Sequence, residues 1–152
     1  MNYRMKSLTI LLAGLTLASA VAHAQSGSPS RNLPSTQIKF SPSGVKDAGG
    51  RELLISPAYG DLGKGPHGTF IRMPAGFSSA IHIHTGDYWG VVVAGVAANG
   101  KPGAPDLALP PGSYWFQKGG EDHVTKCISG NECLFFVSQT DPFDYVPSKE
   151  AK

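Results

Sequence analysis

Short runs of β-branched, aromatic and other apolar residues alternate along this chain with breaks that contain Gly, Pro, Asn or Ser. None of the runs shows the apolar repeat at every third or fourth position that a helix of ten or more residues requires. The runs cover residues 37–40, 52–56, 68–73, 80–84, 88–94, 113–117, 123–128 and 134–138. Many short strands at this spacing, in a chain this small, predict an all-β sandwich or barrel.

The first 24 residues have the pattern of an export signal. Arg4 and Lys6 give it a positive start, residues 8–21 are mostly apolar, and Ala22-His23-Ala24 is a small-x-small cleavage motif. Polar residues interrupt the apolar run, which is too short for the roughly 20 residues of a stable membrane span. We therefore expect cleavage before Gln25, and a mature protein that is periplasmic or secreted with no stable membrane span.

The rest of the chain has the size of one domain, about 128 residues. Residues 25–35 are rich in Ser, Pro and Gly and predict a flexible linker. Residues 36–141 contain all the predicted strands and form the expected barrel. Residues 142–152 contain two prolines and end in charge, which indicates a loose tail over the barrel.

The charge balance bears on the kind of partner. The chain has 13 Lys and Arg against 11 Asp and Glu, and two of the basic residues belong to the predicted export signal, which leaves 11 against 11. Nucleic acids and anionic membrane surfaces attract proteins with a basic excess. The mature chain lacks that excess, so a small-molecule ligand or substrate is the better prediction.

The two cysteines, Cys127 and Cys133, lie close together in a chain that leaves the reducing cytoplasm, and we expect them to form a disulfide. Ser129-Gly130-Asn131 between them is a turn signal, so the bridge is expected to link the two strands of one hairpin. A loop this short stabilises the fold by on the order of 2 kcal/mol. Residues 97–105, with Asn99-Gly100 and two prolines, predict an exposed loop.

His82 and His84 are the first candidate metal ligands. In a strand, residues two apart lie on the same face about 6 to 7 Å apart, so both imidazoles point the same way, as two ligands of a single ion must. The alternative is a pair of polar residues near a strand end. His67 lies in the turn-like stretch Gly65-Pro66-His67-Gly68 and is predicted to be a surface histidine.

Residues at fixed intervals surround this histidine pair. Gly76 stands six residues before His82, Tyr88 stands four after His84, and Gly95 lies seven beyond Tyr88.

A second group of spaced residues follows downstream, with Gly112, Lys118, Gly120, His123 and Cys127 at intervals of six, two, three and four. Together the two spacings resemble the two motifs of the cupin family, over roughly residues 68–138. Among cupins the chain is most similar to the small exported ChrR-like group. Three residues depart from the family pattern: Tyr88 replaces a glutamate, Lys118 a proline and Cys127 an asparagine.

The resemblance implies a single-domain cupin, a double-stranded β-helix with the form of a jelly-roll barrel, in which His82, His84 and His123 hold one divalent metal ion. Imidazole ligands suit zinc, manganese, iron, nickel and copper, so the metal stays open. The family's glutamate is a usual fourth ligand. Here Tyr88 is expected to lie next to the ligands and to donate a hydrogen bond to bound water or substrate, the alternatives being direct ligation or a ring that only fills the barrel. Asp87 is the other candidate fourth ligand, unless it stabilises its turn.

These features lead to two functional hypotheses. The first is a metal-dependent enzyme, of oxygenase or isomerase type, that acts on a small organic molecule. The second is a metal-binding or ligand-binding module, or a sensor, without turnover. One barrel hosts many chemistries, so the sequence leaves open whether the protein is an enzyme. A barrel without metal is a third reading, and a homodimer formed through exposed strands is possible.

Overall fold

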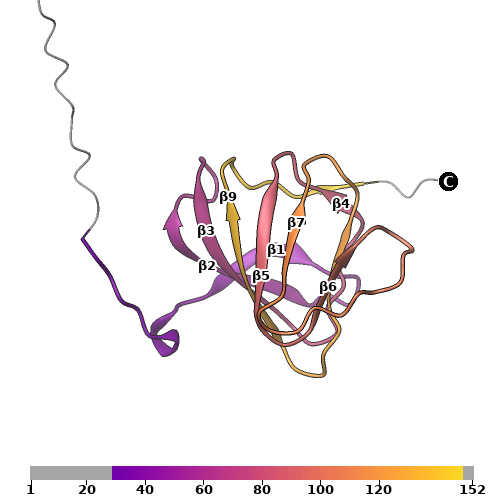
Figure 1. Ribbon diagram of the computed structural model, residues 1–152, viewed down its shortest axis with the longest axis horizontal. Coiled ribbons are helices and arrows are strands. Elements are labelled where there is room, and N and C mark those ends of the chain that lie inside the picture. Colours follow the sequence, from indigo (N-terminus) through magenta and orange to yellow (C-terminus); the bar gives the residue numbers. More distant parts are fainter. Residues whose placement is uncertain (1–28, 149–152) are drawn as a thin grey trace, which may run out of the picture. The chain divides into compact units, whose positions relative to one another are not determined.

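Figure 1 shows the computed structural model, which describes residues 29–148. The predicted export signal, residues 25–28 of the predicted linker and the last four residues of the tail lie outside the described residues. Within residues 29–148, no helix is both long and apolar enough to cross a membrane. A 3₁₀ turn, η1 (Ser35–Gln37), precedes the first strand.

The strands form two layers, as Figure 1 shows. The larger layer is a six-stranded antiparallel sheet in the order β1-β2-β3-β9-β5-β7. Its strands are β1 (Ser41–Lys46), β2 (Glu52–Gly60), β3 (His67–Met73), β9 (Cys133–Gln139), β5 (Tyr88–Ala94) and β7 (Tyr114–Gln117). The smaller layer contains two strand pairs, β10 (Val146–Pro147) with β4 (His82–Ile83), and β6 (Ala97–Gly100) with β8 (Val124–Cys127). This confirms the predicted all-β fold, the double-stranded β-helix.

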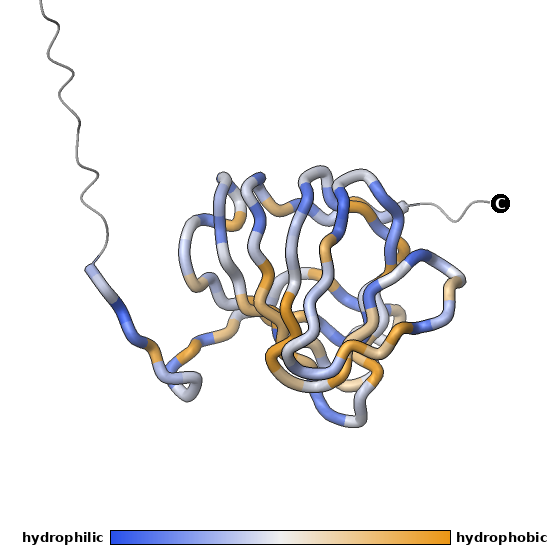
Figure 2. Tube along the Cα trace, in the orientation of Figure 1, coloured by the Kyte–Doolittle hydropathy of each residue, from blue (hydrophilic) through white to orange (hydrophobic). Residues whose placement is uncertain are grey.

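The core lies between the layers because alternate residues of each strand point inward. In β9, Cys133, Phe135, Val137 and Gln139 are buried, and the residues between them are partly exposed. The buried cluster joins side chains of the large sheet to Ala97 and Cys127 of the small layer. Figure 2 shows hydrophobic residues concentrated in the strands, whereas the loops at the upper edge are mostly hydrophilic.

Glycines shape the turns between these strands. The four glycines of the two cupin-like motifs all have positive φ, a conformation that L side chains rarely adopt. Their φ angles are 69° for Gly76, 77° for Gly95, 88° for Gly112 and 75° for Gly120.

One strand prediction and one loop prediction were wrong in place. The run 37–40 is not a strand, and β1 begins at Ser41 although it contains Pro42 and Gly44. This strand is at the edge of the sheet and its register shifts between Pro42 and Lys46, which is where a strand tolerates such residues. The predicted loop 97–105 begins with β6, since Ala97 and Ala98 are buried against β8.

The predicted disulfide is confirmed, but the predicted hairpin around it is wrong. Cys127 and Cys133 are bonded, with their Cα atoms 5.7 Å apart. However, β8 pairs with β6, and β9 pairs with β3 and β5. The disulfide therefore joins the two layers of the barrel at a turn between them.

Candidate metal centre

His82 and His84 point into the barrel from β4 and the residue after it. Their side chains are 3% and 4% exposed, and the centroids of their rings lie 4.9 Å apart. Ile83 between them is only half-buried. The alternation predicted for a strand thus places both imidazoles on one face.

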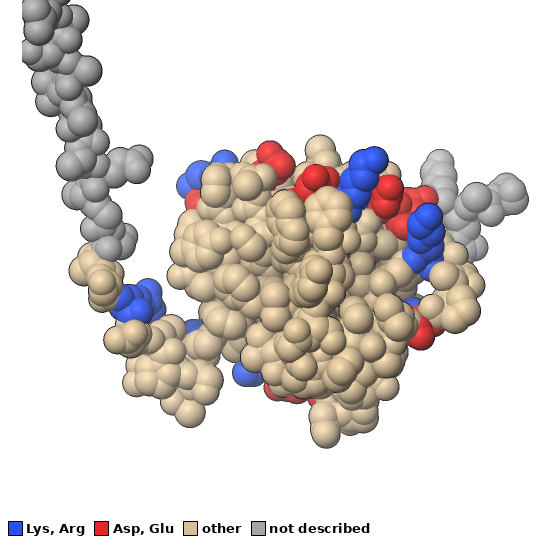
Figure 3. All heavy atoms as spheres, viewed as in Figure 1, with Lys and Arg blue, Asp and Glu red and all other residues tan. Residues whose placement is uncertain are grey.

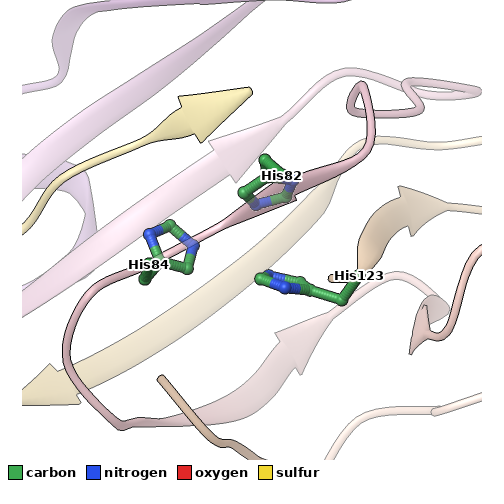
Figure 4. A group of neighbouring side chains, drawn as sticks. All are labelled: His82, His84 and His123. Carbon is green, nitrogen blue, oxygen red and sulfur yellow. The ribbon is translucent and has the colours of Figure 1, made fainter. Parts of the chain in front are cut away.

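His123 joins them because a pair of main-chain hydrogen bonds connects the two motifs. The amide of His82 donates to the carbonyl oxygen of His123 at 3.1 Å, and the amide of His123 donates to that of His82 at 3.0 Å. The His123 ring centroid lies 4.1 Å from that of His82 and 5.2 Å from that of His84. One ring nitrogen from each histidine lies within 4.8 Å of the others, and Figure 4 shows the three rings turned toward one another. These three buried histidines could hold a metal ion.

The hydrogen bonds of the rings fix which nitrogen faces the centre. A carbonyl oxygen only accepts, so each Nδ1 that contacts one must carry the proton, and Nε2 then keeps its lone pair. His123 Nε2 is buried and has no hydrogen-bond partner among the described residues. Main-chain acceptors of this kind orient metal-binding histidines in other proteins. The acceptors are the carbonyl oxygens of Ala80 for His82 at 2.9 Å, of Asp144 for His84, and of Glu121 for His123 at 3.0 Å.

Burial keeps the three imidazoles neutral. It lowers the pKa of His82 to about 3, and the neighbouring His123 ring adds to the effect. Burial also lowers the pKa of His84 and that of His123. At neutral pH the cluster therefore presents lone pairs, the form in which imidazole binds a metal.

Tyr88 lies beside this cluster in β5. Its ring is 6% exposed and stands edge-on to His84, with 5.0 Å between the ring centroids. Burial raises the pKa of Tyr88 to about 12, an effect that hydrogen bonding with Trp115 and Thr125 only partly offsets. The phenol is thus a protonated neighbour of the cluster.

The nearby carboxylates point elsewhere. Asp87 is exposed, and its Oδ1 accepts a hydrogen bond from the amide of Gly119 at 2.7 Å. Asp122 is also exposed and accepts a hydrogen bond from the hydroxyl of Ser148. In the part of the chain that the structure describes, the metal-type cluster consists of the three histidines.

Residues 142–148, here called the C-terminal strap, cover the cluster. The Tyr145 ring stacks on His82, with centroids 4.3 Å apart and planes 26° from parallel. Phe143 lies against His84, with a centroid distance of 4.8 Å. Val146–Pro147 forms β10 against β4. The sequence predicts a loose tail over the barrel. These residues lie there, and they also pack against the candidate ligands.

Further hydrogen bonds fix the strap. The Asp144 carboxylate accepts from the amide of Thr85 at 2.8 Å and from its hydroxyl, and the Ser148 amide donates to the Ile81 carbonyl at 2.9 Å. Asp144 and Tyr145 were not predicted from the sequence as site residues. Residues 143–145 alternate aromatic, acidic and aromatic side chains between two prolines. This strand-like alternation was the signal in the sequence that both aromatic rings share one face.

His67 is not the surface residue that its turn-like context predicts. It is the first residue of β3 and is 0% exposed, and its Nδ1 lies 3.0 Å from the hydroxyl of Thr69. Burial lowers the pKa of His67, and a hydrogen bond with Gln139 opposes that shift. Residues 67, 69, 71 and 73 all point inward, as alternate residues of one strand do. The Gly-Pro pair before His67 suggests a turn and so hides this pattern in the sequence.

The two-layered barrel and its inward histidine cluster define a cupin, which confirms the resemblance in the sequence. More particularly, residues 43–152 match the model of the family described as "Domain of unknown function (DUF4437)", and the chain belongs to that family. A comparison with curated proteins found no match.

Solved structures share this fold at low sequence identity. The polyketide cyclase RemF from Streptomyces resistomycificus is 18% identical with a TM-score of 0.64, over 82% of this chain and 89% of the cyclase. A cupin-2 domain protein from Rhodospirillum rubrum is 13% identical with a TM-score of 0.61, over 80% of this chain and 81% of that one. The DMSP lyase DddQ from Ruegeria pomeroyi is 20% identical with a TM-score of 0.58, over 76% of this chain and 64% of the lyase. At these identities the likeness shows the fold alone.

Proposed function

We propose that this protein is an exported cupin that binds one divalent metal ion through His82, His84 and His123, and that it is a metal-dependent enzyme of oxygenase or isomerase type acting on a small organic molecule. One observation carries the proposal. Three buried, neutral imidazoles each donate Nδ1–H to the main chain and turn the other nitrogen toward a shared centre. A metal ion would also give a partner to the buried lone pair of His123 Nε2, which has none among the described residues.

The chain's own residues would position and enclose the reaction. Three neutral histidine ligands leave the metal ion its double positive charge. A bound ion would therefore polarise an oxygen atom of the small molecule or lower the pKa of a bound water. Tyr88 is proposed to donate a hydrogen bond near the ion rather than to bind it, because burial favours its protonated form. Phe143 and Tyr145 cover the cluster and limit the access of water. The solved structures with a similar fold include a cyclase and a lyase, which are enzymes. By analogy of fold alone, this supports an enzyme over a sensor.

The test is metal analysis of the full chain, purified without a histidine tag. We expect close to one divalent ion per chain, and loss of that ion in the His82→Ala, His84→Ala and His123→Ala variants with an unchanged circular dichroism spectrum. His67→Gln is the matched control, because it removes a buried histidine outside the cluster. Failure to bind any ion after reconstitution, or metal content unaffected by His82→Ala and His123→Ala, would refute the metal centre. Oxygen uptake and product analysis with small aliphatic keto compounds would then separate an enzyme from a non-catalytic binder or sensor.

Export from the cytoplasm is the second part of the proposal. The Cys127–Cys133 disulfide is typical of an oxidising compartment and supports it. The experiment is N-terminal sequencing of the protein recovered from the periplasm or the medium of the expressing cells. A mature chain that begins at Gln25 is expected, and an uncleaved chain that stays in the cytoplasm would contradict export.

We also propose that two copies pair through the outer face of β5 and β7. Five apolar side chains on this face are 40% exposed or more, and the rings of Trp89 and Phe116 pack on each other 5.2 Å apart. The five side chains are neighbours on two paired strands, so they form one contiguous apolar patch rather than scattered apolar residues, and such patches often mark an interaction site. The five are Trp89, Val91, Val93, Tyr114 and Phe116.

A second copy is the occupant that fits this face. The sequences of β5 and β7 contain no charged residue, and the charged side chains seen in Figure 3 lie around the edge of this face rather than in its middle. A stable interface takes about 800 Å² from each partner, so the half-buried Phe70, Leu134 and Phe136 of the neighbouring strands would have to contribute.

A further inference from the structure

A cavity of about 50 Å³ lies beside the histidine cluster, between the two layers of the barrel. His82 and His84 form part of its wall, and Phe143 and Tyr145 of the strap also line it. Of the fifteen described residues that line it, none is Asp, Glu, Lys or Arg. Apart from the two histidines, the walls are almost entirely aliphatic and aromatic.

The few other polar groups in the lining are neutral, and several already have partners. The indole N–H of Trp115 and the amide oxygen of Gln139 are exceptions, since both are buried without a hydrogen-bond partner among the described residues. The Thr125 hydroxyl donates to Oδ1 of Asn99 at 2.7 Å, and the Ser79 hydroxyl accepts the amide of Thr125 at 3.0 Å. The Gln139 amide donates to the carbonyl oxygen of Gly86 at 3.3 Å. An ionised group on a ligand would therefore meet no opposite charge here, and burying such a group unpaired is very costly.

The apolar wall extends away from the histidines along β9. Gln139 lies opposite Tyr88, next to the cluster, whereas Val137 is opposite Gly90 and Phe135 is opposite Val92. From Gln139 to Phe135 the strand rises about 13 Å. A ligand anchored at the histidines would point its far end at Val137 and Phe135.

The volume restricts what can occupy this space. An engineered protein cavity of about 150 Å³ binds benzene. The cavity here is about a third of that, so a short aliphatic chain fits where a ring does not.

We propose that the cavity takes a short aliphatic compound whose one negative group binds the metal at the histidine cluster, and that it rejects ligands with a second charge, either a cation or another carboxylate. The inference rests on the proposed function, because the metal ion supplies the counter-charge that the described lining residues lack. It adds a ligand class to that function.

Three probes of equal chain length test the charge rule on the full chain loaded with Co²⁺, whose visible spectrum changes when a ligand enters its coordination. Butyrate, β-alanine and succinate share a carboxylate and two methylenes, and end in a methyl, an ammonium and a second carboxylate. We expect butyrate to bind at least about tenfold more tightly than either of the others, since only its far end is apolar. Equal or tighter binding of β-alanine or succinate would overturn the inference, as would binding of none of the three.

Two further measurements test the size rule and the location. Benzoate is expected to bind at least about tenfold more weakly than butyrate, and equal binding would overturn the size limit. Val137→Ala enlarges the predicted far end, so hexanoate should gain affinity at least about fivefold relative to butyrate. Val91→Ala is the matched control, because Val91 lies on the outer face of the sheet. If hexanoate gains no affinity in Val137→Ala, or gains equally in both variants, the far end of the ligand does not lie at Val137.

Cobalt content is measured before the probes are added. A chain that takes up no cobalt refutes the metal centre and the ligand class together. A chain that binds cobalt in its histidine cluster and fails to distinguish the probes refutes the ligand class alone.

Discussion

Nδ1 of His84 donates a hydrogen bond to the main-chain carbonyl oxygen of Asp144, sixty residues further along the chain. The same Asp144 accepts from the amide and the hydroxyl of Thr85 through its carboxylate. A residue of the C-terminal strap thus fixes both the tautomer of a candidate ligand and the backbone next to it.

Asp144→Ala should weaken metal binding without abolishing it. The variant keeps the carbonyl oxygen but frees the strap from Thr85, so His84 loses its fixed orientation. Loss of such a supporting contact typically lowers metal affinity by about 10-fold to 100-fold. The measurement is competition with a chelator of known affinity. Asp141→Ala, an exposed carboxylate just before the strap, is the control, and equal affinities in both variants would contradict the role of Asp144.

The sequence could predict the barrel and the cluster because both depend on local patterns. Alternation placed His82 and His84 on one face, and the motif spacing added His123. The contribution of Asp144 depends on a contact between residues far apart in the chain, which no local pattern encodes. His67 was misjudged for a related reason, since the Gly-Pro pair before it is typical of a surface turn, and only the pairing of β3 with β9 buries it.

The sequence left open whether Tyr88 or Asp87 completes the metal site, and two variants decide between the alternatives. We expect Tyr88→Phe and Asp87→Asn both to retain about one metal ion per chain, because the Tyr88 phenol stays protonated and Asp87 faces outward to Gly119. Asp87→Asn should lower the free energy of unfolding by about 1 kcal/mol, because it weakens the hydrogen bond to the Gly119 amide. Elemental analysis and urea unfolding provide the two readouts. Loss of metal in either variant would identify that residue as a ligand.

The disulfide should contribute more to stability than to the metal site. Cys127→Ala/Cys133→Ala is expected to lower the free energy of unfolding by about 2 kcal/mol, the value for a short closed loop. Urea unfolding of the variant and of the reduced wild-type protein measures this, and both should lose a similar amount. Metal content should stay unchanged, since neither cysteine belongs to the cluster. A reduced protein as stable as the oxidised one would contradict the prediction.

The outer face of β5 and β7 makes a separate prediction about assembly. Phe116→Glu places a charge at the middle of this face and should convert a dimer to a monomer, measured as molar mass by light scattering after size exclusion. Lys39→Glu, a charge change in the segment before β1, is the control and should leave the dimer intact. A wild-type chain that is monomeric at micromolar concentration would rule the pairing out.

The metal-free protein should lose stability as the pH falls below about 6.5. Burial lowers the pKa of His67, His82, His84 and His123 in the folded chain, and unfolding returns each to its ordinary value near 6.5. Between the folded and unfolded pKa values the unfolded chain binds more protons, so acid favours unfolding. Each imidazole that stays neutral contributes a slope of about 1.4 kcal/mol per pH unit.

His82, with its folded pKa of about 3, alone predicts a loss of roughly 3 kcal/mol between pH 6 and pH 4. Urea unfolding at intervals of half a pH unit measures the slope in the presence of a chelator. His67→Gln removes one buried imidazole and should make the slope shallower, while leaving the contribution of the cluster in place. Metal binds the folded chain only through neutral imidazoles, so the loaded protein should be more stable at pH 7 and lose that advantage in acid. A stability that stays constant from pH 7 to pH 4 in the metal-free protein would mean that the histidines are not held in a buried, neutral state.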